Sequence, residues 1–274
     1  MKIPWQNFKF NKGKMKPIHT KKLKPGVALI TGGAKRIGKK IAKNLASDGW
    51  KVVIHYNKNN IAAKELKSEI IKNKGSAEII KCDLNNYNSV KNLIEKSNKK
   101  FGSLSLLINN ASKFENDDIK KLNVESWDSH NNINLKAPLF LSRDFSKQIK
   151  KNTPGLIINI IDQRVFFPNP EFISYTSSKQ SLMWLTQTLA QALSPQIRVC
   201  AIGPGPTLKG ARQSKKDFEN QSLSTPLMIG SNPEEIYQAV KFIIDMPSFT
   251  GQMITLDGGE HLDWIKKEDK NFKD

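Results

Sequence analysis

Short apolar runs of strand length recur along the chain, and nearly all of them are separated by segments of helix length. The seven runs cover residues 27–31, 52–56, 77–82, 104–108, 155–161, 197–202 and 252–256. Strands that alternate with helices predict right-handed crossovers and a parallel sheet that is covered on both faces. We therefore expect an α/β fold, a doubly wound parallel sheet of seven strands in a single domain. Ligands of such folds bind at the carboxyl ends of the strands.

The length and the two ends of the chain define the expected domain. A chain of 274 residues with 38% hydrophobic content can bury one large core. Residues 1–25 carry eight lysines, no acid and no apolar period, which predicts a basic arm, and 266–274 read as a charged tail. The expected domain is 26–265. Because the sequence has no run of eighteen apolar residues and no apolar signal-peptide core, we expect a cytoplasmic protein without a membrane span.

The net charge of +19 comes from 39 lysines and only 5 arginines against 25 acids. Surfaces that read nucleic acids favour the planar fork of arginine, so this composition predicts no specific nucleic-acid role. The two cysteines, Cys82 and Cys200, lie in separate apolar segments and read as free thiols in a reducing compartment. We expect no metal site.

A glycine-rich stretch, TGGAKRIGKKIA at 31–42, follows the first apolar run. Gly32 and Gly33 permit a tight turn, and Gly38 lets the backbone approach a ligand at the N-terminus of a helix. Free N–H groups and the helix dipole favour a pyrophosphate there. The stretch therefore predicts a dinucleotide site that includes Gly32, Arg36, Ile37 and Gly38.

This loop resembles that of the short-chain dehydrogenase/reductase family, TGxxxGxG, with Arg36 in place of the middle glycine. The form TGxxKRIG is similar to that of the pteridine-reductase branch, and the resemblance implies a Rossmann-like fold. Because arginine is scarce in this chain, an arginine here indicates function. We expect its guanidinium to reach the 2′-phosphate of NADP.

The segment after the second run supports the same cofactor. NAD-binding sheets commonly place an acid there to accept from the ribose 2′-OH. The sequence VVIHYNKNN has none, and Asn57, Lys58 and Asn59 stand near that position. A carboxylate would repel the extra phosphate, so its absence favours NADP(H) over NAD(H).

Further motifs follow in the family's order, over roughly residues 26–260. The resemblance implies that Asp83 and Leu84 lie beside the adenine, that Asn134 holds a water of the proton relay, and that GPGPT at 203–207 lies against the nicotinamide. Residues 208–230 read as a substrate lid or as a plain loop. The implied cofactor contacts from the remaining motifs are Asn110, Ala111 and Ser112 of LINNAS, together with Pro204, Gly205 and Thr207.

Tyr-x-x-x-Lys occurs three times, beginning at Tyr87, Tyr175 and Tyr237. Only Tyr175 lies between the fifth and sixth runs, after LINNAS and Asn134, where the family has its catalytic pair. Residues four apart share a helix face, so the Lys179 ammonium is expected to lower the pKa of Tyr175 and make it a proton donor. The family also implies that Lys179 holds the nicotinamide ribose.

An acid, Asp162, stands thirteen residues before Tyr175, where ordinary family members have a serine. The chain has no serine between residues 147 and 173. A carboxylate would repel the alkoxide that develops in ketone reduction, whereas pterin rings offer nitrogens that take protons. Pteridine reductases carry aspartate here, and Phe114 matches their pterin-stacking phenylalanine. A structural turn acid and a core phenylalanine are the alternative interpretations.

Together these residues predict an NADPH-dependent reductase of a pteridine or dihydrofolate-like C=N bond. Hydride would pass to a ring carbon while Tyr175 and Asp162 supply the proton, with Ser112 and Phe114 also at the substrate. The alternatives are a carbonyl reductase of the same family, for example on a 3-oxoacyl thioester, and a non-catalytic NADPH-binding protein. The family implies a homotetramer packed through the helices around Asn134 and Tyr175.

Overall fold

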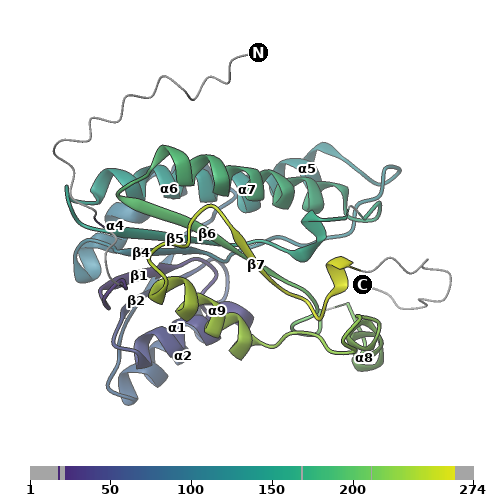
Figure 1. Ribbon diagram of the computed structural model, residues 1–274, viewed down its shortest axis with the longest axis horizontal. Helices are drawn as coiled ribbons and strands as arrows, with labels where there is room; N and C mark the ends of the chain where they lie inside the picture. The colour runs from purple at the N-terminus through teal and green to yellow at the C-terminus, as the bar shows by residue number, and fades with distance from the viewer. Residues whose placement is uncertain (1–17, 19–21, 168, 211, 263–274) are drawn as a thin grey trace, which may run out of the picture.

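One parallel sheet of seven strands organises the molecule, which a computed structural model describes at residues 18, 22–167, 169–210 and 212–262 (Figure 1). The strand order is β3-β2-β1-β4-β5-β6-β7, and every neighbouring pair is parallel. The strands are β1 (Val27–Ile30), β2 (Lys51–Tyr56), β3 (Ser76–Lys81), β4 (Leu106–Asn109), β5 (Gly155–Ile160), β6 (Ile197–Pro204) and β7 (Met253–Leu256). The predicted seven-stranded, doubly wound fold is confirmed.

Helices cover both faces of the sheet (Figure 1). Side chains of α1, α2 and α9 build one hydrophobic core, and side chains of α4, α6 and α7 build the other. The α-helices are α1 (Arg36–Ser47), α2 (Asn60–Lys72), α3 (Tyr87–Val90), α4 (Leu93–Phe101), α5 (Val124–Asn131), α6 (Ala137–Gln148), α7 (Ile173–Ala192), α8 (Lys215–Leu223) and α9 (Pro233–Asp245). Shorter turns are the π-helix η2 (Asn132–Lys136) and the 3₁₀ turns η3 (Gln163–Val165) and η4 (Glu260–Leu262).

The sequence explains why the strands form where they do. All residues of β1, β4, β5 and β6 are buried, as expected for central strands with helices on both faces. Two helices begin with a capping box, in which side chain and backbone satisfy each other's hydrogen bonds. Asn232 and Glu235 start α9 in this way, and Ser214 and Asp217 start α8.

The amino-terminal boundary differs slightly from the prediction. Leu23 is buried in the core beside α9, its N–H donates to the Ile244 carbonyl at 3.3 Å, and Lys22 pairs with Asp245. The domain therefore begins a few residues before 26. The rest of the predicted arm, apart from residue 18, and the tail at 266–274 lie outside the described residues. Among the described helices, none has the length and apolarity needed to span a bilayer.

The strand order places a crevice at the middle of the sheet. From β1 the chain builds outward through β2 to β3, and it then returns to the other side of β1 with β4. The loops that follow β1 and β4 consequently leave in opposite directions, which opens a space at their carboxyl ends. This reversal is where the candidate site lies.

A second Tyr-x-x-x-Lys pair has a packing role. The Tyr237 hydroxyl donates to Asp48 Oδ2 at 2.6 Å, and Lys241 Nζ lies 3.5 Å from the same oxygen. Tyr237 and Lys241 are on α9, whereas Asp48 caps α1. The pair therefore joins the two helices, far from the cavity described below.

We predict that Tyr237→Phe destabilises the fold by about 1 kcal/mol, because it removes one hydrogen bond and leaves Asp48 accessible to water. Catalytic activity should not change, since the hydroxyl touches only α1. Urea unfolding followed by circular dichroism measures the first effect and steady-state kinetics the second. A loss of activity at unchanged stability would contradict the packing role.

Candidate active site

A cavity of about 560 Å³ opens at the carboxyl ends of the strands, at the reversal in strand order. Most residues predicted for the site line it, although they come from seven different parts of the sequence. They are Gly32, Arg36, Ile37, Gly38, Asn57, Leu84, Asn110, Ala111, Ser112, Phe114, Asp162, Tyr175, Lys179, Pro204, Gly205 and Thr207. The residues named from the sequence are therefore about half of those that line the cavity.

Four predicted residues do not line the cavity that the described residues form: Lys58, Asn59, Asp83 and Asn134. The Asn59 side chain accepts from the Ala62 N–H at 2.9 Å, so it caps α2. Asp83 accepts from the Asn57 amide at 3.2 Å and orients that side chain. Lys58 is exposed. The prediction of Asn59 as a cofactor ligand is corrected to a helix cap.

The phosphate loop has the tight geometry that its glycines predict. Gly32 has a φ of +61°, in the left-handed region that favours glycine. A Cβ on Gly38 would lie 2.4 Å from the Gly32 carbonyl oxygen and 2.5 Å from Asn110 Nδ2. Only glycine fits at that position. The loop can therefore bring its backbone close to a ligand at the start of α1.

A buried histidine, which the sequence analysis missed, fixes one N–H of this loop. Gly32 N–H donates to His55 Nδ1 at 2.9 Å, so the ring carries its proton on Nε2, which faces the Cys82 carbonyl at 2.9 Å. Burial lowers the pKa of His55 to about 4. The neutral ring connects β1, β2 and β3 behind the loop without adding charge to the cavity.

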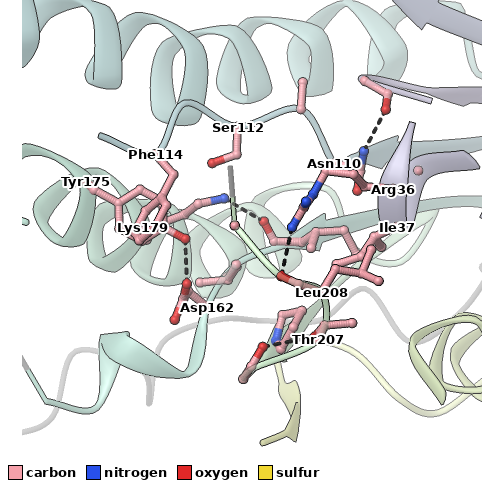
Figure 2. A pocket seen from close by; sticks show the side chains of 18 of the residues that line it. Arg36, Ile37, Asn110, Ser112, Phe114, Asp162, Tyr175, Lys179, Thr207 and Leu208 are labelled. Carbon is pink, nitrogen blue, oxygen red and sulfur yellow. Dashed lines mark hydrogen bonds between the residues drawn. The ribbon is translucent and has the colours of Figure 1, made fainter. Parts of the chain in front are cut away.

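Arg36 replaces the family's middle glycine and adopts a φ of +53°. Its guanidinium crosses the cavity and donates to the carbonyls of Leu208 at 3.0 Å and Lys209 at 2.8 Å (Figure 2). Because Arg36 also lines the cavity, the expectation that it reaches a 2′-phosphate stays a prediction. Arg36 joins the phosphate loop to the segment after β6, and Lys35 is the neighbouring cation that lines the cavity.

One hydrogen bond joins two of the predicted catalytic residues. The Tyr175 hydroxyl, on α7, donates to Asp162 Oδ2 at 2.5 Å (Figure 2). The other carboxylate oxygen accepts from the Arg164 N–H at 2.9 Å, which holds Asp162 at the start of η3. Asp162 thus lies two residues after the end of β5, and it lines the cavity together with Tyr175. Short charge-assisted bonds of this kind are among the stronger hydrogen bonds in proteins.

This arrangement corrects the expected pKa of Tyr175. Burial and the negative charge of Asp162 raise the pKa of Tyr175 well above its ordinary value. The Lys179 ammonium lies 5.8 Å from the centroid of the tyrosine ring, whereas the carboxylate touches the hydroxyl. The nearer charge dominates, so the tyrosine is held in its protonated form.

Lys179 is buried beside this pair. Its Nζ donates to the Ile160 carbonyl at 2.9 Å, and the residue is 2% exposed. Burial lowers the pKa of Lys179 to about 8, although the charge of Asp162 opposes the shift. The ammonium is therefore charged at neutral pH, but its pKa lies only about one unit above that pH.

Phe114 faces the cavity from the loop after β4. Its ring stacks on Phe172 at 4.7 Å and meets Tyr175 edge-on at 4.6 Å. The ring is 38% exposed, too much for a core residue. An aromatic surface therefore adjoins the Tyr175 hydroxyl, as a flat substrate would need.

Asn134 lies behind the cavity and is fully buried. Its Oδ1 accepts from the Lys113 N–H at 2.8 Å and from the Ser112 hydroxyl at 3.2 Å. Its Nδ2 donates to the Lys113 carbonyl at 2.9 Å and to Ser178 Oγ at 3.0 Å. The side chain is saturated by protein groups, so a role in holding a relay water would have to fall to its backbone.

Several lining residues were not predicted. Arg164 could have been found by the scarcity argument that singled out Arg36. Lys35 gave no such signal in a lysine-rich chain, and nothing near His55 or Glu260 marked either as a site residue. Residues of the predicted lid do line the cavity: Leu208, Gly210, Arg212, Gln213, Phe218 and Gln221.

The sequence of this chain matches one protein family. The model of the short chain dehydrogenase family matches residues 26–220. A 3-oxoacyl-[acyl-carrier-protein] reductase of Synechocystis sp. is 30% identical over 237 residues, which cover 85% of this chain and 96% of the relative.

Two solved structures are more similar in sequence. FolM alternative dihydrofolate reductase 1 from Brucella canis, complexed with NADP, is 40% identical with a TM-score of 0.86 and covers 93% of this chain and 100% of its own. The protein of the same description from Brucella suis, in complex with NADP, is 43% identical with a TM-score of 0.85, over 87% of this chain and 96% of that one.

The lowered pKa of Lys179 predicts how stability depends on pH. The pKa of Lys179 is about 8 in the folded protein and about 10.4 in the unfolded chain. Below pH 8 the lysine is charged in both states, so the full cost of burying its charge lowers the stability of the fold. This penalty disappears as pH rises from 8 to 10.4. We expect Lys179→Met to be more stable than the ligand-free wild type at pH 7, by up to about 3 kcal/mol.

The difference in stability should shrink as the pH approaches 10. Urea unfolding of both proteins at pH 7, 8, 9 and 10 measures it. A variant that is less stable by the same amount at every pH would mean that the lysine's hydrogen bond outweighs its desolvation.

Proposed function

Because the chain belongs to the short chain dehydrogenase family, we propose that it is an NADPH-dependent reductase of a pteridine or dihydrofolate-like C=N bond. The observation that carries the proposal is the Asp162 carboxylate bonded to the Tyr175 hydroxyl, with the Phe114 ring beside it. The similarity to two alternative dihydrofolate reductases, both in complex with NADP, supports the substrate class and the cofactor.

The charge of Asp162 favours a ring nitrogen over a ketone. Reduction of a ketone develops negative charge on oxygen, which a carboxylate in contact with the proton donor would oppose. Reduction of a C=N bond needs a proton at nitrogen, and amino groups on a pterin ring can donate to a carboxylate. The same acid that hinders one reaction therefore assists the other.

The glycine loop and the start of α1 would hold the cofactor's pyrophosphate, and the cofactor supplies the hydride. Lys179 would hold the nicotinamide ribose, near Asp162 and Tyr175. Phe114 would lie against the flat face of the substrate, with Ser112 at its edge. Each of these side chains lines the cavity.

Tyr175 and Asp162 would deliver the proton together. The raised pKa keeps the tyrosine hydroxyl protonated at neutral pH, but it also makes the hydroxyl a weaker acid that needs help to donate. Donation would leave a tyrosinate in contact with a carboxylate, two negative charges in a buried site. A proton from solvent that Asp162 takes up and passes to the tyrosinate would restore the starting pair and avoid this repulsion, while the Lys179 ammonium stabilises the transient charge.

The assembly and its location are part of the same proposal. Trp127 on α5 and Trp184 on α7 are 40% and 71% exposed, respectively. Large apolar side chains on these two helices suit subunit contacts of a homotetramer. Both cysteines, Cys82 and Cys200, are buried free thiols, which suits the cytoplasm.

Asp162→Asn tests the proposed substrate class. It should keep NADPH binding but lower the turnover of a dihydropterin by roughly 10²–10⁴, the range of general-acid assistance. Asp162→Ser should restore a neutral hydroxyl and gain activity on a simple ketone. The assay follows NADPH absorbance with dihydropterins, dihydrofolate and a 3-oxoacyl thioester, with Tyr237→Phe as the matched control. Undiminished pterin reduction by Asp162→Asn would contradict the role of the acid and favour a 3-oxoacyl thioester reductase instead.

Cofactor choice gives a second test. NADPH should bind more tightly than NADH, because no acid follows β2 and Lys35 lines the cavity at the start of α1. Lys35→Gln should weaken NADPH binding about tenfold and leave NADH binding unchanged, since one cation on a phosphate contributes roughly 1–2 kcal/mol. Lys40→Gln, which removes only an ion pair between α1 and Glu234 on α9, is the control. Isothermal titration that finds equal affinities for both cofactors would refute the preference.

A further inference from the structure

The first part of the segment after β4 (residues 112–117) alternates between two environments from Ser112 to Glu115. Ser112 and Phe114 line the cavity, whereas Lys113 and Glu115, and beyond them Asn116 and Asp117, do not. The side chains of Lys113 and Glu115 lie on one side of the segment, because Lys113 Nζ pairs with Glu115 Oε2 at 3.0 Å. This period of two is that of an extended chain. A shift by one residue would turn Phe114 out of the cavity.

Three polar side chains on the neighbouring helix hold the alternate residues of this segment. They are spaced four apart, and each meets one anchored residue in antiparallel order. We call this set the anchoring ladder; its rungs join Lys113 to Asn134, Glu115 to His130, and Asp117 to Ser126.

The spacing of the ladder follows from helix and strand geometry. Four residues of α-helix rise about 6 Å, and two residues of extended chain span about 6.6 Å, so the rungs stay in step. Four residues also turn an α-helix about 40° past one full turn. Asn134 lies in the wider π turn η2, which has more residues per turn and so brings the first rung back toward the line of the others.

The first two rungs bind the backbone itself. Asn134 accepts from the Lys113 N–H at 2.8 Å and donates to the Lys113 carbonyl at 2.9 Å. His130 Nε2 accepts from the Glu115 N–H at 3.2 Å. Because the bonds are to N–H and C=O groups, they fix the register of the segment whatever its side chains are.

His130 can form its rung in only one protonation state. It is fully buried, and its Nδ1 lies 2.8 Å from the Ser126 carbonyl, which only accepts. Nδ1 therefore carries the proton, and Nε2 must accept from the Glu115 N–H, which only donates. Burial lowers the pKa of His130, in keeping with a neutral ring.

The third rung connects the segment to the catalytic helix. Ser126 Oγ donates to Asp117 Oδ2 at 2.8 Å, and Asp117 Oδ1 accepts from the Ser174 N–H at 3.0 Å. Ser174 immediately precedes Tyr175 on α7. The same ladder that turns Phe114 toward the cavity is thus attached to the backbone next to the tyrosine.

We propose that the anchoring ladder sets the register of residues 112–117 and that His130 is a positioning residue for Phe114 against Tyr175. His130 touches neither the cavity nor the reacting groups, and it acts through the segment. The link to catalysis rests on the proposed function, but the effect on the segment does not.

Hydrogen–deuterium exchange tests the register directly and needs no substrate. In His130→Ala, the amide exchange of a peptide covering 111–118 should rise roughly tenfold, because the middle rung is lost. Peptides from β4 and β5 should be unchanged. Asn131→Ala, which alters the next, partly exposed residue and whose side chain bonds only the Trp127 carbonyl, should leave the segment protected. Unchanged exchange of 111–118 in His130→Ala would overturn the proposal.

A double-mutant cycle tests the link to catalysis. His130→Ala should lower kcat/KM for a dihydropterin roughly tenfold in the wild type and less than twofold in a Phe114→Ala background, because both changes act through one ring. His130→Gln, whose amide can accept and donate, should recover most of the loss. Additive effects would overturn the positioning role.

Two controls keep the outcomes separate. A wild-type protein that reduces no dihydropterin would refute the proposed function, while the exchange result would still decide the ladder. If His130→Ala does not fold, Ser126→Ala removes the third rung instead, and the exchange of 116–118 should then rise. Protection retained there would count against the ladder.

Discussion

Parallel pairing is the constraint on which the rest of this structure depends. Seven parallel strands must all end at the same edge of the sheet, and each must be followed by a crossover that returns over one face. The site residues that follow β1, β4, β5 and β6 therefore collect at one edge, although they are far apart in sequence. The reversal between β1 and β4 then opens a cavity there, lined by Gly38, Ala111 and Asp162 from three separate crossovers.

Within that cavity, the position of one charge decides the chemistry. Tyr175 has a carboxylate in hydrogen-bond contact and an ammonium farther away, so its proton is held rather than released. In a buried site the attraction between the hydroxyl and Asp162 is weakly screened, and so is the repulsion if both groups become negative. The pair is therefore suited to passing a proton while staying singly charged. A neutral serine in place of Asp162 would impose no such restriction.

The sequence predicted what depends on local physics and missed what depends on distant geometry. Strands buried on both faces must be apolar runs, and Gly38 must be glycine where backbone meets backbone, so both were readable. The cap at Asn59 could also have been predicted, since asparagine before a helix commonly caps it. Asn59 was instead assigned to the cofactor site. The order of motifs separated Tyr175 from Tyr87 and Tyr237. The pKa of Tyr175 could not be predicted from the sequence, because it depends on the burial of the hydroxyl and on its contact with Asp162.

The contacts of Arg36 also could not be predicted from the sequence, and they explain why an arginine occupies this position. Its partners, the carbonyls of Leu208 and Lys209, lie more than 170 residues away, and no local pattern announces them. The left-handed backbone disfavours a side chain by about 1–2 kcal/mol, which the family's glycine would avoid. Glycine would leave both carbonyls without these donors, and lysine lacks the rigid fork that reaches two acceptors at once. Because the bonds are to backbone oxygens, the sequence of the segment after β6 can vary while its attachment to the phosphate loop persists.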